Sequence, residues 1–305
     1  MRCSKEEIMH YKLSKDRVVF SIIAYSFLTI FTLCCILPFG FVISGAFSSE
    51  QSILEYGYSL LPHEFSTAAF RTILAAPGDI LNAYGVTILV TVAGTLTGLL
   101  ITAMAAYVLG RKCFPHRNAF AFFFYFTTIF EGGIVPKYIL MIRYLGIKNN
   151  LLALILPLLI NVFYIIIMRS SISASIPDSL IESAEIDGAG EFQIFRKIVM
   201  PLSKPILATV GLFMALEYWN DWFNAMLYVD KKSLIPIQYY LYKMLSQITM
   251  LRELVSKVPQ LTVVTPPEES FKMAMTLVTI GPILILYPFV QKYFVSGIMV
   301  GAVKG

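Results

Sequence analysis

Long apolar runs separated by short polar segments dominate this sequence. Six of them are long enough, or nearly so, to cross the hydrocarbon of a bilayer as helices, which takes about 20 residues each. They cover residues 18–43, 80–109, 118–136, 151–168, 206–229 and 273–290. The pattern predicts an all-α, polytopic membrane protein with six transmembrane helices. The third run is the weakest, because Glu131-Gly132-Gly133 interrupts it.

The composition agrees with a membrane protein. Of the 305 residues, 57% are hydrophobic and 14% are charged. Soluble domains carry about 45–50% apolar and about 25% charged residues. A soluble chain is therefore excluded as a reasonable interpretation, and the net charge of +5 is better read as a guide to topology than to nucleic-acid binding.

Lysines and arginines near the ends of the runs predict the orientation of the chain. The larger set flanks one side in short segments and comprises Arg2, Lys5, Lys12, Lys15, Arg17, Arg111, Lys112, Arg117, Arg169, Arg196, Lys197, Lys204, Lys292 and Lys304. This bias places the tail 1–17 and both termini in the cytoplasm, with the transmembrane domain over 18–305. It also places a segment at about 169–204 in the cytoplasm and a long loop at about 230–272 outside.

The cytoplasmic segment contains "LIESAEIDGAGEFQIFRKIVMPLSKP", residues 180–205, which is far more polar than its surroundings. Ser175-Ile176-Pro177-Asp178 predicts a helix start with Ser175 as its cap, and Gly188 predicts the end of that helix in a left-handed turn. A second helix is expected from about residue 191 to 199, ended by Pro201, with Phe192, Phe195 and Val199 on one stripe. Two helices this short neither cross a bilayer nor stand alone in water, so they need a partner surface.

Two uses fit such a segment, namely docking of a soluble protein and an interfacial helix lying on lipid. An interfacial helix favours a strongly cationic polar face. Four acidic residues occur here instead: Glu182, Glu185, Asp187 and Glu191. Docking is therefore the favoured interpretation.

These residues closely resemble the EAA loop of bacterial ABC-importer permeases. The matching positions are Glu182-Ser183-Ala184, Asp187-Gly188-Ala189, Phe195, Ile198, Pro201 and Pro205, with Ser183 in place of the usual alanine. "AYVLGRKCFPHRN" and "EYWNDWFNAMLY" are similar to other parts of the same family, and "QKYFVSGIMVGAVKG" resembles the tail of maltose-type carbohydrate permeases. "GGIVPKYILMIRYLGIKNN" is similar to a subgroup associated with complex oligosaccharides and polysaccharide fragments.

The resemblance implies a type I ABC importer permease fold whose cytoplasmic loop forms coupling helices in a cleft of an ATPase. The implied ATPase-coupling residues are Glu182, Ala184, Asp187, Gly188, Ala189, Phe195 and Pro201. Gly188 would be the elbow, Glu182 a polar contact, and Ala184, Ala189 and Phe195 the packing face. The implied partners are a second, different permease chain, an ATPase dimer, an extracytoplasmic solute-binding protein, the sugar and the bilayer of a bacterial inner (plasma) membrane.

A second group of residues forms a candidate substrate path. It comprises Glu131, Tyr218, Trp219, Asn220, Asp221, Trp222 and Asn224. Aromatic faces stack on sugar rings and amides hydrogen-bond to hydroxyls, while polar groups inside a membrane are functional candidates because they are costly there. Glu217 and Asp221, four apart, are expected on one helical face. The alternatives are an aromatic belt at the membrane interface and, for Glu131, a position at the rim.

The long outer loop has two interpretations. In maltose-type permeases the corresponding loop contacts the binding protein, and "QITMLRELVSKV" predicts an amphipathic helix suited to such a contact. The alternative is a lid that packs on the chain's own outer surface.

Enzymatic functions are disfavoured. No Gly-x-x-x-x-Gly-Lys-Ser/Thr occurs, and no His/Cys cluster has metal-ligand spacing, so no cofactor, metal, catalytic residue or nucleic-acid partner is expected. The predicted function is the permease subunit of an ATP-driven sugar importer, powered by separate ATPase subunits docking on 180–205. The alternatives are an importer permease for an amino acid or peptide, and an ion-coupled secondary transporter, against which the lack of internal repeats counts.

Overall fold

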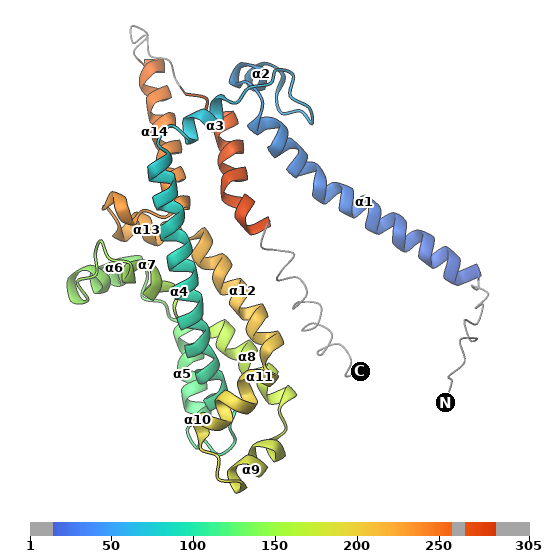
Figure 1. Cartoon of the computed structure of the whole chain (residues 1–305), viewed down its shortest axis with the longest axis vertical. Coiled ribbons are helices and arrows are strands. Elements are labelled where there is room, and N and C mark those ends of the chain that lie inside the picture. The colour runs from blue at the N-terminus through green and yellow to red at the C-terminus, as the bar shows by residue number, and fades with distance from the viewer. Residues whose placement is uncertain (1–14, 258–265, 285–305) are drawn as a thin grey trace. The chain divides into compact units, whose positions relative to one another are not determined.

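The computed structural model describes residues 15–257 and 266–284, drawn in colour in Figure 1. Among these residues the secondary structure is helical, apart from one isolated bridge between Ser48 and Phe65. The all-α prediction is confirmed. The tail 1–14, part of the outer loop and the end of the sixth predicted run lie outside the described residues.

The described residues form fourteen α-helices and a further helical segment at 269–284. They are α1 (Lys15–Ala46), α2 (Glu50–Tyr56), α3 (Ala68–Ile73), α4 (Pro77–Gly110), α5 (Arg117–Ile129), α6 (Ile134–Ile139), α7 (Leu152–Ile155), α8 (Val162–Ser175), α9 (Asp178–Ile186), α10 (Glu191–Ile194), α11 (Met200–Leu202), α12 (Lys204–Asn220), α13 (Phe223–Tyr228) and α14 (Ile237–Lys257). They divide into two units. The first holds residues up to 72 together with 266–277, and the second holds 73–265 together with the residues from 278 onwards.

The first unit is built on α1. Its apolar stretch runs from Val18 to Ala46 with a mean hydropathy of 2.3, and none of the side chains in its most apolar window is buried within the chain. Such a helix needs lipid or another protein around it. Beyond α1, the Glu50 carboxylate at the start of α2 accepts hydrogen bonds from the amides of Glu269 and Ser270 at 3.0 and 3.2 Å. This carboxylate satisfies N–H groups that the first turn of helix 269–284 leaves free.

The second unit is built around α4, against which α8 and α12 pack. Two glycines of α4 allow this close approach. A Cβ on Gly94 would lie 2.4 Å from the ring of Tyr218, and one on Gly98 would lie 2.5 Å from the methyl of Met214. Small residues at such crossings let helix backbones approach closely inside a membrane. The sequence therefore fixes where α12 meets α4.

Two of the predicted runs, the third and the fourth, are bent rather than straight. The third breaks after Ile129, and the segment from Ile134 turns through 109°, with Gly133 at a φ of 82° between them. The prediction of one helix over 118–136 is therefore wrong at its C-terminal end, because the glycine pair lets the chain turn. The fourth bends by 54° before α8, which begins where the Asn161 side chain accepts a hydrogen bond from the amide of Phe163. Helix α8 then continues past the predicted end at residue 168.

Two helices, Val18–Ala46 and Pro77–Gly110, are long and apolar enough to cross a membrane singly, and the number among the described residues is five if each of three bent pairs is counted as one span. The sixth predicted run, 273–290, starts inside the helical segment 269–284 and ends outside the described part. The structure thus agrees with a multi-pass membrane protein.

Candidate functional site

The candidate coupling loop begins where α8 passes into α9. The N-cap of α9 is Pro177, and no side chain caps it. Ser175 is the last residue of α8, so the prediction that Ser175 caps α9 is wrong, because α8 continues through it. Asp178 in the first turn of α9 lies 2.6 Å from the Lys112 ammonium, whose hydrogen bond holds the pKa of that carboxyl below its ordinary value.

Gly188 forms the elbow of the loop, as predicted. Its φ is +81°, the left-handed region that favours glycine. The Gly188 amide donates to the Glu185 carbonyl at 3.0 Å, and the Ala189 amide donates to the Ala184 carbonyl at 2.9 Å. These two bonds are those of a Schellman motif, which closes a helix C-terminus. No heavy atom lies within 4 Å of where a Cβ would stand, so the backbone angle alone selects glycine here.

The second arm of the elbow is longer than predicted. Helix α10 continues through a π-helical turn, Phe195–Val199, into α11, and Pro201 lies inside α11. The prediction that Pro201 ends the helix near residue 199 is wrong. Proline lacks an N–H and its ring clashes with the carbonyl four residues back, and the widened turn just before it is where the helix absorbs this. The arm joins α12 at an 82° bend.

One side of the elbow is buried in the chain's own core. Ile181, Ile194, Phe195 and Val199 are each at most 5% exposed and belong to one apolar cluster with residues of α4, α8 and α12. The Phe195 ring centroid lies 5.7 Å from that of Tyr107 on α4. Phe195 is therefore occupied within its own chain rather than presented outwards as a packing face.

The two alanines predicted to contact an ATPase also pack against their own chain. Ala184 and Ala189 are half-buried against the same cluster. Their small side chains let the elbow lie close to the core, and their backbone groups make one of its two closing hydrogen bonds. A role for Ala184, Ala189 or Phe195 in contacting an ATPase stays a prediction.

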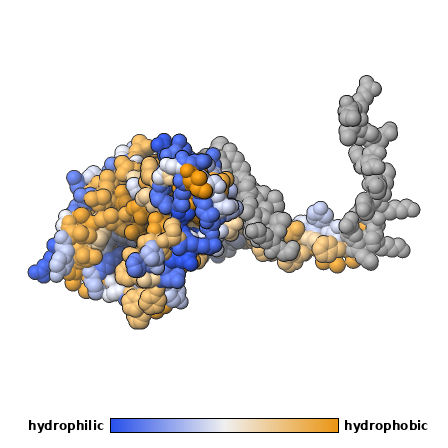
Figure 2. Space-filling view, turned by 90° about the horizontal axis from the view of Figure 1, so that it is seen from below, coloured by the Kyte–Doolittle hydropathy of each residue, from blue (hydrophilic) through white to orange (hydrophobic). Residues whose placement is uncertain are grey.

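The opposite side of the elbow exposes two large apolar side chains that the sequence analysis did not assign to docking. Ile186 is 86% exposed and Phe192 is 70% exposed, one on each side of Gly188. Glu182, Asp187 and Pro201 are also exposed. The end of the second unit that carries α9 and α10 faces the viewer in Figure 2, where hydrophilic residues surround a smaller apolar patch.

Arg111 ties both arms of the elbow to the end of α4. Its guanidinium pairs with Glu185 on α9 and, at 3.2 Å, with Glu191 at the start of α10. The Tyr107 hydroxyl also donates to the Glu191 carboxylate. The Arg111 side chain is only 12% exposed, whereas the Glu185 and Glu191 side chains are 43% and 60% exposed, so both pairs lie at the surface. The elbow is therefore anchored on α4 by charge as well as by packing.

Two aromatic residues of the candidate substrate path, Tyr218 and Trp219, are buried inside the chain rather than open to a substrate. Tyr218 and Trp219 are 3% and 7% exposed. The Tyr218 hydroxyl donates to the Ile155 carbonyl at 2.9 Å, and the Trp219 indole N–H donates to the Thr279 carbonyl at 3.1 Å. Both polar groups are satisfied within the chain, as buried aromatic residues require.

The fifth predicted run is not one helix, since α12 ends at Asn220 and α13 begins at Phe223. The Asp221 carboxylate accepts hydrogen bonds from the backbone amide of Asn224 at 3.1 Å and from its side chain at 2.9 Å. Such local bonds compete with the helix and break it. The prediction that Glu217 and Asp221 share a helical face is therefore wrong, and Glu217 instead accepts from the Tyr164 hydroxyl at 2.7 Å.

Three predicted path residues remain accessible. Asn220 is exposed, and its side-chain oxygen accepts a hydrogen bond from the Gln238 side chain at 3.1 Å. Trp222 is 37% exposed and stacks on Tyr242 of α14. Glu131 is exposed between α5 and α6. Among the described residues, no hydrogen bond or ion pair joins Glu131 to α12 or α13, so the structure does not gather the predicted path into one site.

Helix α14, in the loop predicted to lie outside, starts ten residues earlier than "QITMLRELVSKV" suggests, at Ile237, and Val258 lies outside the described residues. Ile237, Leu241 and Ile248 are buried on one side of it, and α14 packs on α4. The lid interpretation therefore holds for this side. Contact with a binding protein stays a prediction for the exposed side, which carries Met250 at 64% exposure.

An apolar bundle around α4, with a charged elbow anchored at its end, defines a multi-pass membrane component of a transport system. The chain belongs to the family described as binding-protein-dependent transport system inner membrane component, whose model matches residues 98–300. This confirms the predicted resemblance of the chain to bacterial ABC-importer permeases.

Several relatives and one solved structure are similar over nearly the whole chain. The polygalacturonan/rhamnogalacturonan transport system permease protein YtcP of Bacillus subtilis (strain 168) is 38% identical, over 95% of this chain and 100% of its own length. Protein LplC of the same organism is 37% identical over 88% and 90%. A crystal structure of a bacterial ABC transporter involved in import of the acidic polysaccharide alginate contains a chain that is 31% identical, with a TM-score of 0.74, over 92% and 98%.

Proposed function

We propose that this chain is the transmembrane permease subunit of an ATP-driven importer that moves an oligosaccharide or polysaccharide fragment across the bacterial inner membrane. In this proposal an extracytoplasmic binding protein delivers the sugar, a second permease chain completes the pore, and an ATPase dimer docks on the 180–205 loop. Six spans with both termini in the cytoplasm fit the distribution of Lys and Arg.

The observation that carries the docking is the pair of exposed apolar side chains, Ile186 and Phe192, on either side of Gly188. Both have acidic sequence neighbours, Glu185 and Asp187 beside Ile186 and Glu191 beside Phe192, while the inward side of the same loop packs against the buried cluster. An apolar anchor pair inside a polar rim is the usual anatomy of a protein interface. Since the elbow is held to α4 by Arg111 and by the buried cluster, a push on it moves α4 rather than bending a loose loop.

The sugar is proposed to be acidic, a fragment of a uronic-acid polysaccharide. The names of one relative and of the solved structure, polygalacturonan and alginate, support this class. Lys137 on α6 and Arg143 on the turn after it are exposed and make no ion pair with any described residue, so they are available to carboxylates. Asn220, Trp222 and Glu131 stay candidate contacts of the path.

The test of docking purifies the complex in mild detergent and identifies the proteins that accompany the chain. We expect a related permease, an ATPase and a binding protein. Ile186→Asp and Phe192→Asp should each reduce the ATPase recovered at least ten-fold, because each places a charge in an apolar contact. Ser179→Asp is the matched control, since it adds the same charge to an exposed position at the start of α9, where the helix dipole favours it.

The same preparation tests the cargo. In proteoliposomes, ATP hydrolysis should rise with binding protein plus galacturonate oligomers and not with binding protein plus neutral oligosaccharides, amino acids or peptides. Stimulation by an amino acid or peptide would support the alternative cargo. Recovery of the chain alone, active with an ion gradient and without ATP, would replace the proposal by a secondary transporter.

A further inference from the structure

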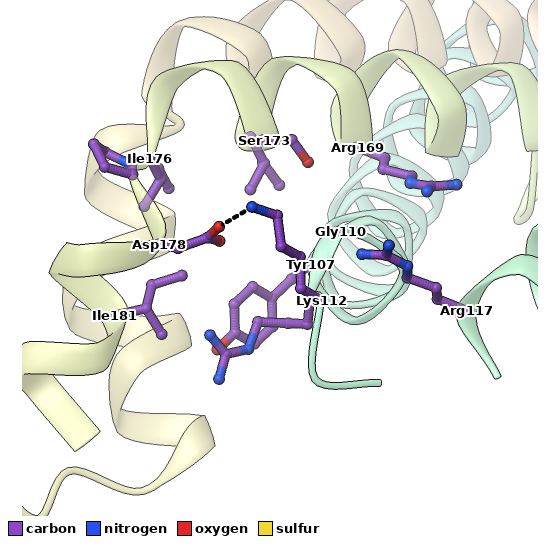
Figure 3. Close-up of a pocket in the computed structure, with 12 residues that line it drawn as sticks. Tyr107, Gly110, Lys112, Arg117, Arg169, Ser173, Ile176, Asp178 and Ile181 are labelled. Carbon is purple, nitrogen blue, oxygen red and sulfur yellow. Dashed lines mark ion pairs between the residues drawn. The ribbon is translucent and has the colours of Figure 1, made fainter. Parts of the chain in front are cut away.

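A basic cavity lies where the end of α8 and the start of α9 meet the connection between α4 and α5 (Figure 3). Its volume is about 360 Å³, within the range of small-ligand sites. Four cations line it, Arg111, Lys112, Arg117 and Arg169, against the single carboxylate of Asp178. The proposed coupling role uses only Arg111, so most of this charge has no assigned purpose.

Two of the four cations are already paired. Lys112 lies 2.6 Å from Asp178, and Arg111 pairs with the two glutamates of the elbow. Arg117 and Arg169 are half-buried, and neither makes an ion pair within the described part of the chain. Figure 3 shows both guanidinium groups on the side of the cavity away from the Lys112–Asp178 pair. Arg117 interacts with the Asp178 carboxylate only at longer range, and half-buried guanidinium groups that no carboxylate pairs with closely are well suited to hold a phosphate.

An apolar groove of about 370 Å³ lies beside this cavity, between α4 and α5. Residues close together in the sequence line both the cavity and the groove. Val108 lines the groove and Arg111, three residues on, lines the cavity. Arg117 lines the cavity, whereas Phe120 and Phe124, three and seven residues on, line the groove. The residues of α5 at these spacings lie on one side of that helix. Helix α5 therefore presents a surface that is apolar along its length and cationic at its first residue, and Arg111 directly follows the last residue of α4.

We propose that an anionic phospholipid binds at this corner, with its phosphate held by Arg117 and Arg169 and an acyl chain in the α4–α5 groove. A free phosphate would fit the cavity but gives the groove no occupant. Helix α4, which ends at Gly110, is long and apolar enough to cross a membrane, so the cationic residues that follow it are expected near a membrane surface. With the proposed orientation this surface is the cytoplasmic leaflet, where anionic lipids attract basic segments and basic pockets bind their headgroups. The identity of the transported sugar does not affect this inference.

The test measures lipid retained by the full-length chain. The protein is placed in nanodiscs of phosphatidylglycerol and phosphatidylethanolamine, and native mass spectrometry counts the phosphatidylglycerol that stays bound on release. The unaltered chain should retain it, and Arg117→Gln and Arg169→Gln should each weaken retention about five-fold. Arg71→Gln removes an exposed arginine on α3 and should leave retention unchanged. Equal retention by the unaltered chain and both cavity variants would overturn the site.

A second variant separates lipid from free phosphate. Val108→Trp fills the groove and keeps both arginines, so it should lower phosphatidylglycerol retention without changing the binding of inorganic phosphate, followed by radiolabelled phosphate. Loss of lipid in the arginine variants but not in Val108→Trp would mean that the site holds a free anion, which contradicts the proposal. Because neither arginine has a carboxylate partner in the described structure, its removal leaves no buried charge unpaired. Circular dichroism confirms folding of each variant.

Discussion

Replacing Gly188 by alanine isolates the backbone contribution of the elbow. The new methyl group meets nothing within 4 Å, so the only native-state penalty is the φ of +81°. A left-handed L-residue costs roughly 1–2 kcal/mol. The stiffer unfolded chain offsets about 0.4–1 kcal/mol of this. A net destabilisation of about 1 kcal/mol should remain, confined to the elbow because the rest of the loop is packed on the core.

Gly190→Ala is the matched control. Gly190 has a φ of −72° and a ψ of 159°, an extended conformation that alanine adopts without strain, and its Cβ would also meet nothing within 4 Å. This variant should be neutral or slightly stabilising. Gly188→Asn should fall between the two, because asparagine tolerates the left-handed region better than alanine does.

The assay is native-state hydrogen exchange of the Ala189 amide, which donates to the Ala184 carbonyl in the closed elbow. A loss of about 1 kcal/mol should speed its exchange about five-fold in Gly188→Ala, with no change or slower exchange in Gly190→Ala. In the assembled importer the same variant should lower ATP hydrolysis stimulated by the binding protein. Equal exchange in the two alanine variants would refute the argument, since it would mean that the left-handed turn does not hold the elbow.

Three further predictions follow from contacts elsewhere. Gly94→Ala should lower the free energy of unfolding by about 1–3 kcal/mol, seen in thermal melting, because the new methyl group overpacks the α4–α12 crossing. Gly85→Ala should not, because nothing lies within 4 Å of its Cβ. Arg111→Gln should loosen the elbow, seen as faster proteolysis of residues 185–191, with Arg111→Lys intermediate because lysine cannot fork between two carboxylates. The ion pair with Lys112 lowers the pKa of Asp178 in the folded protein. The pair therefore stabilises the fold fully at a pH above the unfolded-state pKa of 3.8, and this stabilisation is lost as the pH falls through the lower folded-state pKa. Lys112→Gln should remove that acid-dependent part of the melting profile.

Two long helices and the turn at Gly188 could be predicted from the sequence because one physical constraint determines each of them. The runs 18–43 and 80–109 correspond to Lys15–Ala46 and Pro77–Gly110, because no other structure buries that many apolar residues in lipid. The elbow at Gly188 followed because L-residues avoid the left-handed turn. In both cases the local chemistry leaves no competing outcome.

Which side of each helix in the candidate coupling loop is buried and which is exposed could not be predicted from the sequence. Periodicity tells which residues share a side of a helix but not what that side packs against. Phe192 and Phe195 were expected on one stripe, yet the first is 70% exposed and the second 5%. The π-helical turn begins only at Phe195, so it does not separate these two residues; the chain's own core takes up Phe195 and Val199 and leaves Phe192 outside. The helix break at Asp221 was not predicted either, because it depends on a single hydrogen bond from the Asn224 amide to the Asp221 side chain.

The arrangement of the loop determines how a movement of a docked partner would reach the spans. The inward side of the elbow shares one buried cluster with α4, α8 and α12, and α12 starts directly after α11 at a sharp bend. A force on Ile186 and Phe192 therefore reaches α4 through Arg111 and Phe195, and reaches α12 through the chain itself. Since α12 also crosses α4 at Gly94 and Gly98, the two routes converge on one pair of helices. Packed interfaces of this kind shift as units rather than deforming gradually, so we propose that a docked partner would move the α4–α12 pair through the elbow.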